Sequence, residues 1–142
     1  CRKEYMYVVC ELSSEVYVFD CSAKKPQIIQ SISTLDGCKT ENTCAAIHLS
    51  EDGKYLYASN RGDDSIAVFS VEENHLLKLV EIKKTEGRNP RDFWIGDKLL
   101  LAANQDSNSI TVFRTDLSTG RITYTGKSIS CRKPVCLVSG RN

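Results

Sequence analysis

One eleven-residue pattern occurs three times in the chain, and it restricts the fold more than any other feature. The three copies are VCELSSEVYVF at 9–19, SNRGDDSIAVF at 59–69 and ANQDSNSITVF at 103–113. Their final phenylalanines are 50 residues apart (Phe19 to Phe69) and then 44 residues apart (Phe69 to Phe113). Periods of this length are typical of arrays of one supersecondary unit, including the blades of β-propellers.

Each copy is predicted to be a β-hairpin that is followed by two further strands. Apolar, β-rich runs flank a short polar turn in every copy, and the run before the turn lies at 5–9, 55–59 and 99–103. A weaker strand follows each hairpin, as QIIQSIS, LLKLVEIKK and RITYTGKSIS, and a fourth run lies at 44–50, 90–95 and 134–139. No segment has a convincing 3.6-residue period. The sequence therefore predicts an all-β chain of four-stranded antiparallel blades, a β-propeller.

The position of the chain ends within the repeat predicts a partial propeller. In a propeller the fourth run is the innermost strand of the next blade, which gives two whole blades, at about 44–85 and 90–130. A third blade is then split between the chain ends, with 134–139 reaching back to 5–9. Propellers close with about four to eight blades. The chain also begins on CRKEYMYVV, without an initiator Met, so we expect it to be part of a longer protein or to self-associate through uncovered blade faces.

Composition excludes several partners. Nineteen Lys and Arg against 18 Asp and Glu give a net charge of +1, so no overall field attracts nucleic acid or an acidic membrane. No apolar run approaches the roughly 20 residues that cross a bilayer, and no signal peptide is apparent. The seven cysteines are odd in number and form no C-x-x-C, and only His48 and His75 could complete a zinc site. We expect a cytoplasmic protein with no metal and no cofactor.

The third residue of the repeated pattern changes while its neighbours stay similar. In an antiparallel blade, the turn after the second strand and the loop that enters the innermost strand meet at one edge. The turns carry Glu11, Arg61 and Gln105, whereas the entering loops carry Asn42, Arg88, Asn89, Arg91, Arg132 and Lys133. One rim is therefore predicted to collect a carboxylate, guanidiniums and amides around the channel mouth, where a ligand would bind.

Several stretches of the sequence resemble one known family. They are ELSS at 11–14, ENT at 41–43, IHLSEDGKYLYASNRGDDSIAVF at 47–69, NPRDF at 89–93, LLAANQDSNSITVF at 100–113 and PVC at 134–136. Together they look like the C-terminal portion of the seven-bladed lactonase family, which includes propeller-type 6-phosphogluconolactonases and fungal carboxy-muconate lactonizing enzymes. The resemblance implies that 1–142 is the C-terminal part of one propeller domain, and that its small-molecule partner is a lactone.

The same resemblance implies roles for the rim residues. Glu11 and Arg61 would be catalytic, and Arg91, Asn60, Gln105 and Asn42 would bind substrate. Lactone hydrolysis needs an activated water, donors for the developing oxyanion and an anchor for the substrate. An arginine fork suits a carboxylate or phosphate anchor. The family's His and a further Arg would lie in blades before Cys1, so the chain alone is expected to be inactive.

Two departures from the family pattern leave an alternative function open. The chain has Cys10 where the family commonly has Asn, and Ala46 where it often has Glu. Either change could retune or abolish a site. A Glu or Arg in a β-turn is also most often simply solvated. The alternative is a non-catalytic propeller that binds a protein or small ligand through the same face.

Overall fold

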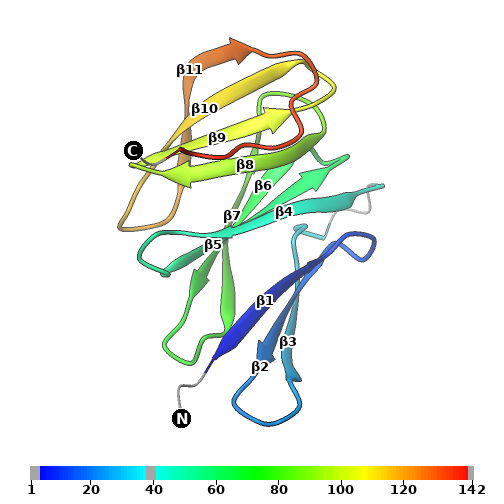
Figure 1. Cartoon of the computed structure of the whole chain (residues 1–142), viewed down its shortest axis with the longest axis vertical. Helices are drawn as coiled ribbons and strands as arrows, with labels where there is room; N and C mark the ends of the chain where they lie inside the picture. Colours follow the sequence, from blue (N-terminus) through cyan, green and yellow to red (C-terminus); the bar gives the residue numbers. More distant parts are fainter. Residues whose placement is uncertain (1–3, 38–40, 141–142) are drawn as a thin grey trace.

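The structure, a computed structural model, describes residues 4–37 and 41–140 and contains only strands and connecting segments in them (Figure 1). The first sheet consists of β1 (Tyr5–Cys10), β2 (Glu15–Asp20) and β3 (Gln27–Ser33). The second consists of β4 (Thr43–Leu49), β5 (Tyr55–Arg61), β6 (Ser65–Val71) and β7 (Leu77–Lys84). The third consists of β8 (Pro90–Gly96), β9 (Leu99–Asn104), β10 (Ser109–Thr115) and β11 (Ile122–Ser130). Each is antiparallel with its strands in chain order, so the predicted all-β class and the two whole blades are confirmed.

The second sheet carries the core because both of its faces are covered. Strand side chains alternate between the two faces of a sheet. The face that packs on the third sheet contributes Tyr57, Ile66 and Val68. The opposite face packs on the first sheet and contributes Leu56, Ala58, Ala67 and Phe69. Strand β6 is therefore apolar without interruption from Ile66 to Phe69, as expected for a strand that is buried on both sides.

The repeated pattern is explained by the hairpin turn that it encodes. The last turn residue, Ser14, Asp64 or Asn108, has a positive φ of 55°, 53° or 52°. Its carbonyl oxygen accepts a hydrogen bond from the backbone N–H of the residue that follows the third strand, which is Thr34, Thr85 or Cys131. Small polar residues tolerate this left-handed conformation best. The turn thus fixes where each blade ends and leaves its first position free to vary.

The inner strands bring the predicted rim together. Strand β4 lies between β1 and β8 (Figure 1), and its first residue, Thr43, pairs with Arg61 at the end of β5. In the third sheet, Pro90 pairs with Asn104 at the end of β9. The entering loops and the turns after the second strands therefore share one edge, as the strand order predicts.

The split blade expected from the sequence is not formed. Residues 134–139 form no strand, and the first sheet keeps three strands. The segment lies near β8, where the Leu137 N–H donates to a carboxylate oxygen of Asp92 (2.7 Å). Strand β1 lies at the other end of the array with β4 in between, so 134–139 does not reach it (Figure 1).

The described cysteines are all free thiols: Cys10, Cys21, Cys44, Cys131 and Cys136. Cys136 is exposed, although a cysteine in a strand-like run is usually a small core residue. Cys1 and Cys38 lie outside the described residues. Over the described part of the chain, no helix is long and apolar enough to span a membrane.

Candidate functional site

The rim places Glu11 and Arg61 in direct contact. Arg61 ends strand β5 and Glu11 begins the β1–β2 turn, so the pair joins neighbouring blades. Nη2 of Arg61 donates to Oε1 of Glu11 and also to the carbonyl oxygen of Cys44 (3.0 Å). The arginine side chain is 17% exposed and the glutamate side chain 63% exposed. The carboxylate of Glu11 is thus oriented by its hydrogen bond to Arg61 and remains open to solvent.

Arg91 belongs to the same cavity as this pair. The cavity has a volume of about 430 Å³ and is lined by Val9, Glu11, Cys44, Ala45, Arg61, Arg91 and Val135. The register of β8 against β9 shifts between Pro90 and Asp92, so Arg91 is the extra residue of a bulge. Bulges redirect side chains and are frequent beside active sites. Among the described residues Arg91 has no hydrogen bond or ion pair, so its guanidinium is available to a ligand.

A similar irregularity shapes the floor of the cavity. Strand β4 shifts register against β5 between Cys44 and Ile47, which takes Ala45 and Ala46 out of the regular ladder. The Ala46 N–H donates to the hydroxyl of Ser59 instead (2.9 Å). Ala45 then lines the cavity with a methyl group only. The bulge therefore leaves room between the two arginines.

The side chains of Asn60 and Asn42 form hydrogen bonds inside the protein beside the rim, and neither residue lines the cavity. Asn60 is completely buried. Its amide donates to the carbonyl oxygen of Thr34 (3.0 Å) and to the Ser65 hydroxyl (3.2 Å), and its oxygen accepts from the Thr34 hydroxyl (2.7 Å). Asn42 donates to Ser14 and to Asn60. The expectation that Asn60 and Asn42 bind substrate does not fit these positions, because their polar atoms are used inside the protein.

Gln105 lies at the same edge but outside the cavity. Its side-chain oxygen accepts from the amide of Asn89 (3.3 Å), and its backbone N–H donates to the carbonyl oxygen of Asn89 (3.0 Å). The next residue, Asp106, accepts from Lys133 (3.2 Å) and from Asn89, and these hydrogen bonds hold the pKa of its carboxyl below the usual value. Gln105 and the charges around it thus form a separate polar cluster on the third blade.

Sequence reasoning missed the buried thiol beneath the arginine. Cys44 lies within 3.4 Å of the Asn60 oxygen and 3.3 Å of the Thr34 hydroxyl. Burial raises the pKa of this thiol, so it stays a neutral donor. The signal for this network was present in the sequence, because Thr34 and Thr85 occupy the same place after the third strand of successive repeats.

The arrangement is suited to an anionic ligand beside a proton acceptor. Two guanidiniums and one carboxylate surround a polar cavity, and the rest of its lining is Val9, Cys44, Ala45 and Val135. Guanidinium forks bind carboxylates and phosphates, and a solvent-open carboxylate can accept a proton from water. Among the described residues no group of three or more His, Cys, Asp or Glu side chains could hold a metal ion.

Fold and site together define a part of a β-propeller whose rim carries charged side chains around a polar cavity. A family model described as a seven-bladed β-propeller lactonase matches residues 2–139. The chain belongs to this family.

Curated and solved relatives agree with that assignment. A 6-phosphogluconolactonase of Bacillus subtilis is 37% identical over 96% of this chain and 41% of its own length. A periplasmic gluconolactonase structure from Pseudomonas aeruginosa superposes with a TM-score of 0.87 and 32% identity, over 92% of this chain and 38% of that chain. The structure of a putative 6-phosphogluconolactonase from Bacteroides uniformis has a TM-score of 0.85 and 42% identity, over 93% and 39% of the two chains. The chain thus spans about two fifths of the length of these relatives.

Proposed function

We propose that this chain is part of an enzyme that hydrolyses a sugar-acid lactone such as 6-phosphogluconolactone. The observation that carries the proposal is the shared cavity of Glu11, Arg61 and Arg91, which lies at the rim where the inner strands begin. The relatives described as 6-phosphogluconolactonase and gluconolactonase support the substrate class. Substrate and activity concern the whole protein, of which these three sheets supply one side of the channel.

In this proposal Glu11 is the base. Arg61 holds one carboxylate oxygen of Glu11, while Oε2 has no partner among the described residues, and the Glu11 side chain is 63% exposed. Oε2 can therefore orient a water and accept its proton as the water attacks the lactone carbonyl carbon. The carbonyl oxygen becomes an oxyanion, and a guanidinium within the cavity stabilises that charge. Collapse of the tetrahedral intermediate breaks the ring C–O bond, and the proton that Glu11 took from the water passes to the ring oxygen, which becomes a hydroxyl. The new carboxylic acid loses its own proton to solvent and leaves as a carboxylate.

Arg91 is the anchor for the anionic end of the substrate. Its exposed guanidinium has no described partner that must be displaced, whereas Arg61 is committed to Glu11 and to the Cys44 carbonyl. A bidentate contact from Arg91 to a phosphate or carboxylate would orient the lactone over Glu11. The proposal leaves Asn60 and Asn42 in a supporting role, beneath the arginine that they help to position.

The direct test is hydrolysis by the full-length protein. Purified protein is assayed against 6-phosphogluconolactone, gluconolactone and a muconate-type lactone, with spontaneous hydrolysis subtracted. We expect the phosphorylated or carboxylated lactones to be preferred over neutral ones. Activity on none of these lactones would contradict the proposal and favour a propeller that only binds ligands. A cytoplasmic location remains a prediction, since one structural relative is described as periplasmic.

A further inference from the structure

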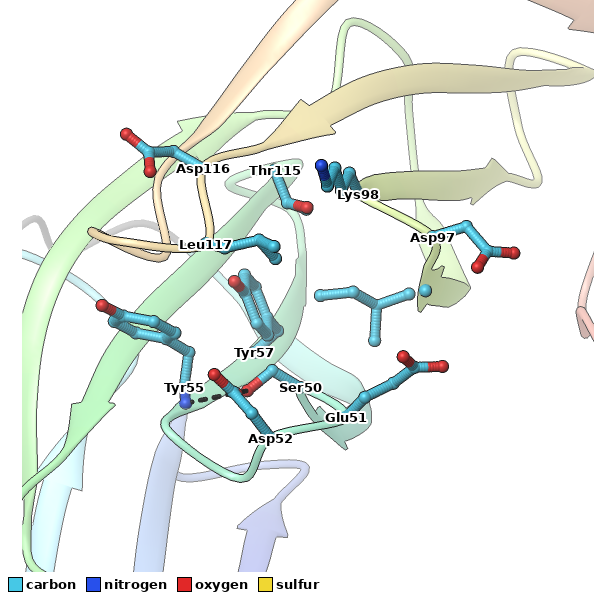
Figure 2. Close-up of a pocket in the computed structure, with 12 residues that line it drawn as sticks. Ser50, Glu51, Asp52, Tyr55, Tyr57, Asp97, Lys98, Thr115, Asp116 and Leu117 are labelled. Carbon is cyan, nitrogen blue, oxygen red and sulfur yellow. Dashed lines mark hydrogen bonds between the residues drawn. The ribbon is translucent and has the colours of Figure 1, made fainter.

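A second cavity lies between the second and third sheets, at the edge opposite the rim (Figure 2). Its volume is about 310 Å³, at the lower end of the range for small-molecule sites. The β4–β5 turn, the β8–β9 turn and the β10–β11 loop surround it. Both sheets lie wholly within the chain, so all of the elements that form the cavity are described.

Aromatic and aliphatic side chains form the walls. Tyr57 is buried, and its hydroxyl donates to the carbonyl oxygen of Gly120 (2.8 Å). The hydroxyl of Tyr55 donates to the carbonyl oxygen of Ser118 (2.6 Å). Leu117, from the β10–β11 loop, lines the cavity with both tyrosines, and Figure 2 shows it next to the ring of Tyr57. The hydrogen bonds fix the rings, so the wall is preorganised for a ligand.

A short turn and a close approach of the backbone lie beside the cavity. The β8–β9 connection is only Asp97 and Lys98, both with positive φ (49° and 62°), as in a tight two-residue hairpin turn. Gly120 lies so close to Tyr55 that a Cβ there would be 2.3 Å from the ring. At the corresponding contact between the first two sheets, the backbone of His75 accepts the Tyr7 hydroxyl and its own ring stacks on Tyr5 at 4.1 Å. The His75 ring thus covers Tyr5, whereas at Gly120 the backbone alone lies against the ring of Tyr55.

The charged groups around the cavity are mostly negative. The cavity lining contains one cationic side chain, Lys98, and four carboxylates, which belong to Glu51, Asp52, Asp97 and Asp116. The carboxylate of Asp52 accepts hydrogen bonds from the Ser50 hydroxyl and the Lys54 N–H, and it forms an ion pair with Lys54. The carboxylate of Asp116 accepts a hydrogen bond from the Ser118 N–H. Among the described residues Glu51 and Asp97 have no hydrogen bond or ion pair, and Figure 2 shows both on the same side of the cavity.

We propose that this cavity binds a small organic cation with an apolar or aromatic body. The body would lie against Tyr55, Tyr57 and Leu117, and the cationic group would lie between Glu51 and Asp97. Tyrosine faces attract cations, and carboxylates without partners add a charge that favours cations over neutral molecules or anions. The site is independent of the lactone site, because it lies at the opposite edge of the blades.

The test compares three probes of similar size on the full-length protein. Isothermal titration calorimetry with benzylammonium, benzyl alcohol and benzoate separates the effect of charge from that of the ring. We expect benzylammonium to bind with a dissociation constant on the order of 1 mM, the affinity typical of so small a ligand. Benzyl alcohol should bind at least about fivefold more weakly, and benzoate should not bind, because Glu51 and Asp97 repel it. Equal binding of the three probes, or no binding of benzylammonium at about ten times that concentration, would overturn the proposal.

Three variants locate the bound probe. Glu51→Gln with Asp97→Asn should weaken benzylammonium about tenfold, since each exposed carboxylate contributes a few-fold. Leu117→Trp should abolish binding by filling the cavity, and because Leu117 is exposed the fold should tolerate the change. Glu73→Gln removes the same charge from an exposed turn elsewhere and should leave binding unchanged. If the double variant or Leu117→Trp, with an unchanged thermal transition, binds like the wild type, the cavity is not the site.

Discussion

Arg61 at the end of β5 is bound to Glu11 in the turn after β1, so one ion pair links two neighbouring sheets at the rim. The two residues occupy the same position in successive copies of the repeat. The repeat therefore builds the blades and also places equivalent turn positions of neighbouring copies next to each other. Because those positions carry opposite charges, Glu11 and Arg61 form an ion pair.

Glu11→Gln in the full-length protein should lower kcat for lactone hydrolysis by about 10²-fold or more, because the amide cannot accept the proton of the attacking water. Stability should change by at most about 1 kcal/mol, because the Glu11 end of the pair is largely exposed and the amide oxygen of the variant can still accept from Arg61. Steady-state kinetics and thermal melting measure the two effects. Glu86→Gln, an exposed carboxylate on a neighbouring loop, is the matched control. A Glu11→Gln enzyme with wild-type kcat would remove this residue from the mechanism.

Arg91→Ala should raise KM for a phosphorylated lactone by about 10- to 100-fold, the contribution of a charge-assisted hydrogen bond. KM for the unphosphorylated lactone should change much less, because that substrate has no anion for Arg91 to bind. Comparing kcat/KM for 6-phosphogluconolactone and gluconolactone gives the result. Arg88→Ala is the control on the same loop. Equal losses on both substrates would mean that Arg91 does not bind the phosphate.

Asn60→Ala should destabilise the protein more than Asn104→Ala, although both asparagines are buried at equivalent positions of successive blades. Asn60 has its amide and its oxygen paired, whereas Oδ1 of Asn104 has no partner among the described residues. We expect a loss of about 2–4 kcal/mol in the free energy of unfolding for Asn60→Ala and roughly half of that for Asn104→Ala. Urea denaturation measures both. The reverse order would show that hydrogen bonding is not the main contribution of these side chains.

The Tyr57→Phe variant should be less stable than the wild type at neutral pH, and this difference in the free energy of unfolding should become smaller above pH 10. Burial raises the pKa of Tyr57 above its usual value of 10.0, so the folded protein keeps the phenol neutral while the unfolded chain ionises it. This contribution to stability is complete below pH 10 and is lost as the pH rises toward the folded-state pKa. At neutral pH the variant should be about 1 kcal/mol less stable, for want of the hydrogen bond to Gly120. Melting temperatures from pH 7 to 11 test this, and two parallel curves would contradict it.

The blades could be predicted from the sequence because their signals are local. Alternating apolar residues and the turn residues Ser14, Asp64 and Asn108 define each hairpin without reference to the rest of the chain. The shared edge of Glu11 and Arg61 also follows from strand order. The burial of Asn60 does not, because only packing between blades shows which residue of the SNR sequence points inward. The position of 134–139 depends on where the ring would close, and the cavity beneath Tyr57 depends on how two blades meet.

The 142-residue chain expressed alone should be inactive and should not remain a monodisperse monomer. Its three sheets form an open array, so no closed channel surrounds Glu11 and Arg61 (Figure 1). Strand β3 exposes Ile28 and Ile29 at 56% and 42%, and the inner edge of β1 has no strand partner among the described residues. Uncovered apolar faces and unpaired edges recruit other chains. Sedimentation velocity at micromolar concentration should show oligomers or aggregates. A single species near 15.9 kDa with a cooperative thermal transition would show instead that these three sheets suffice for a stable fold.

The variant Ile28→Lys removes exposed apolar surface from β3. We expect this change to shift the chain toward monomer in the same measurement. If the wild-type chain is already a monomer, the change would have no effect on sedimentation.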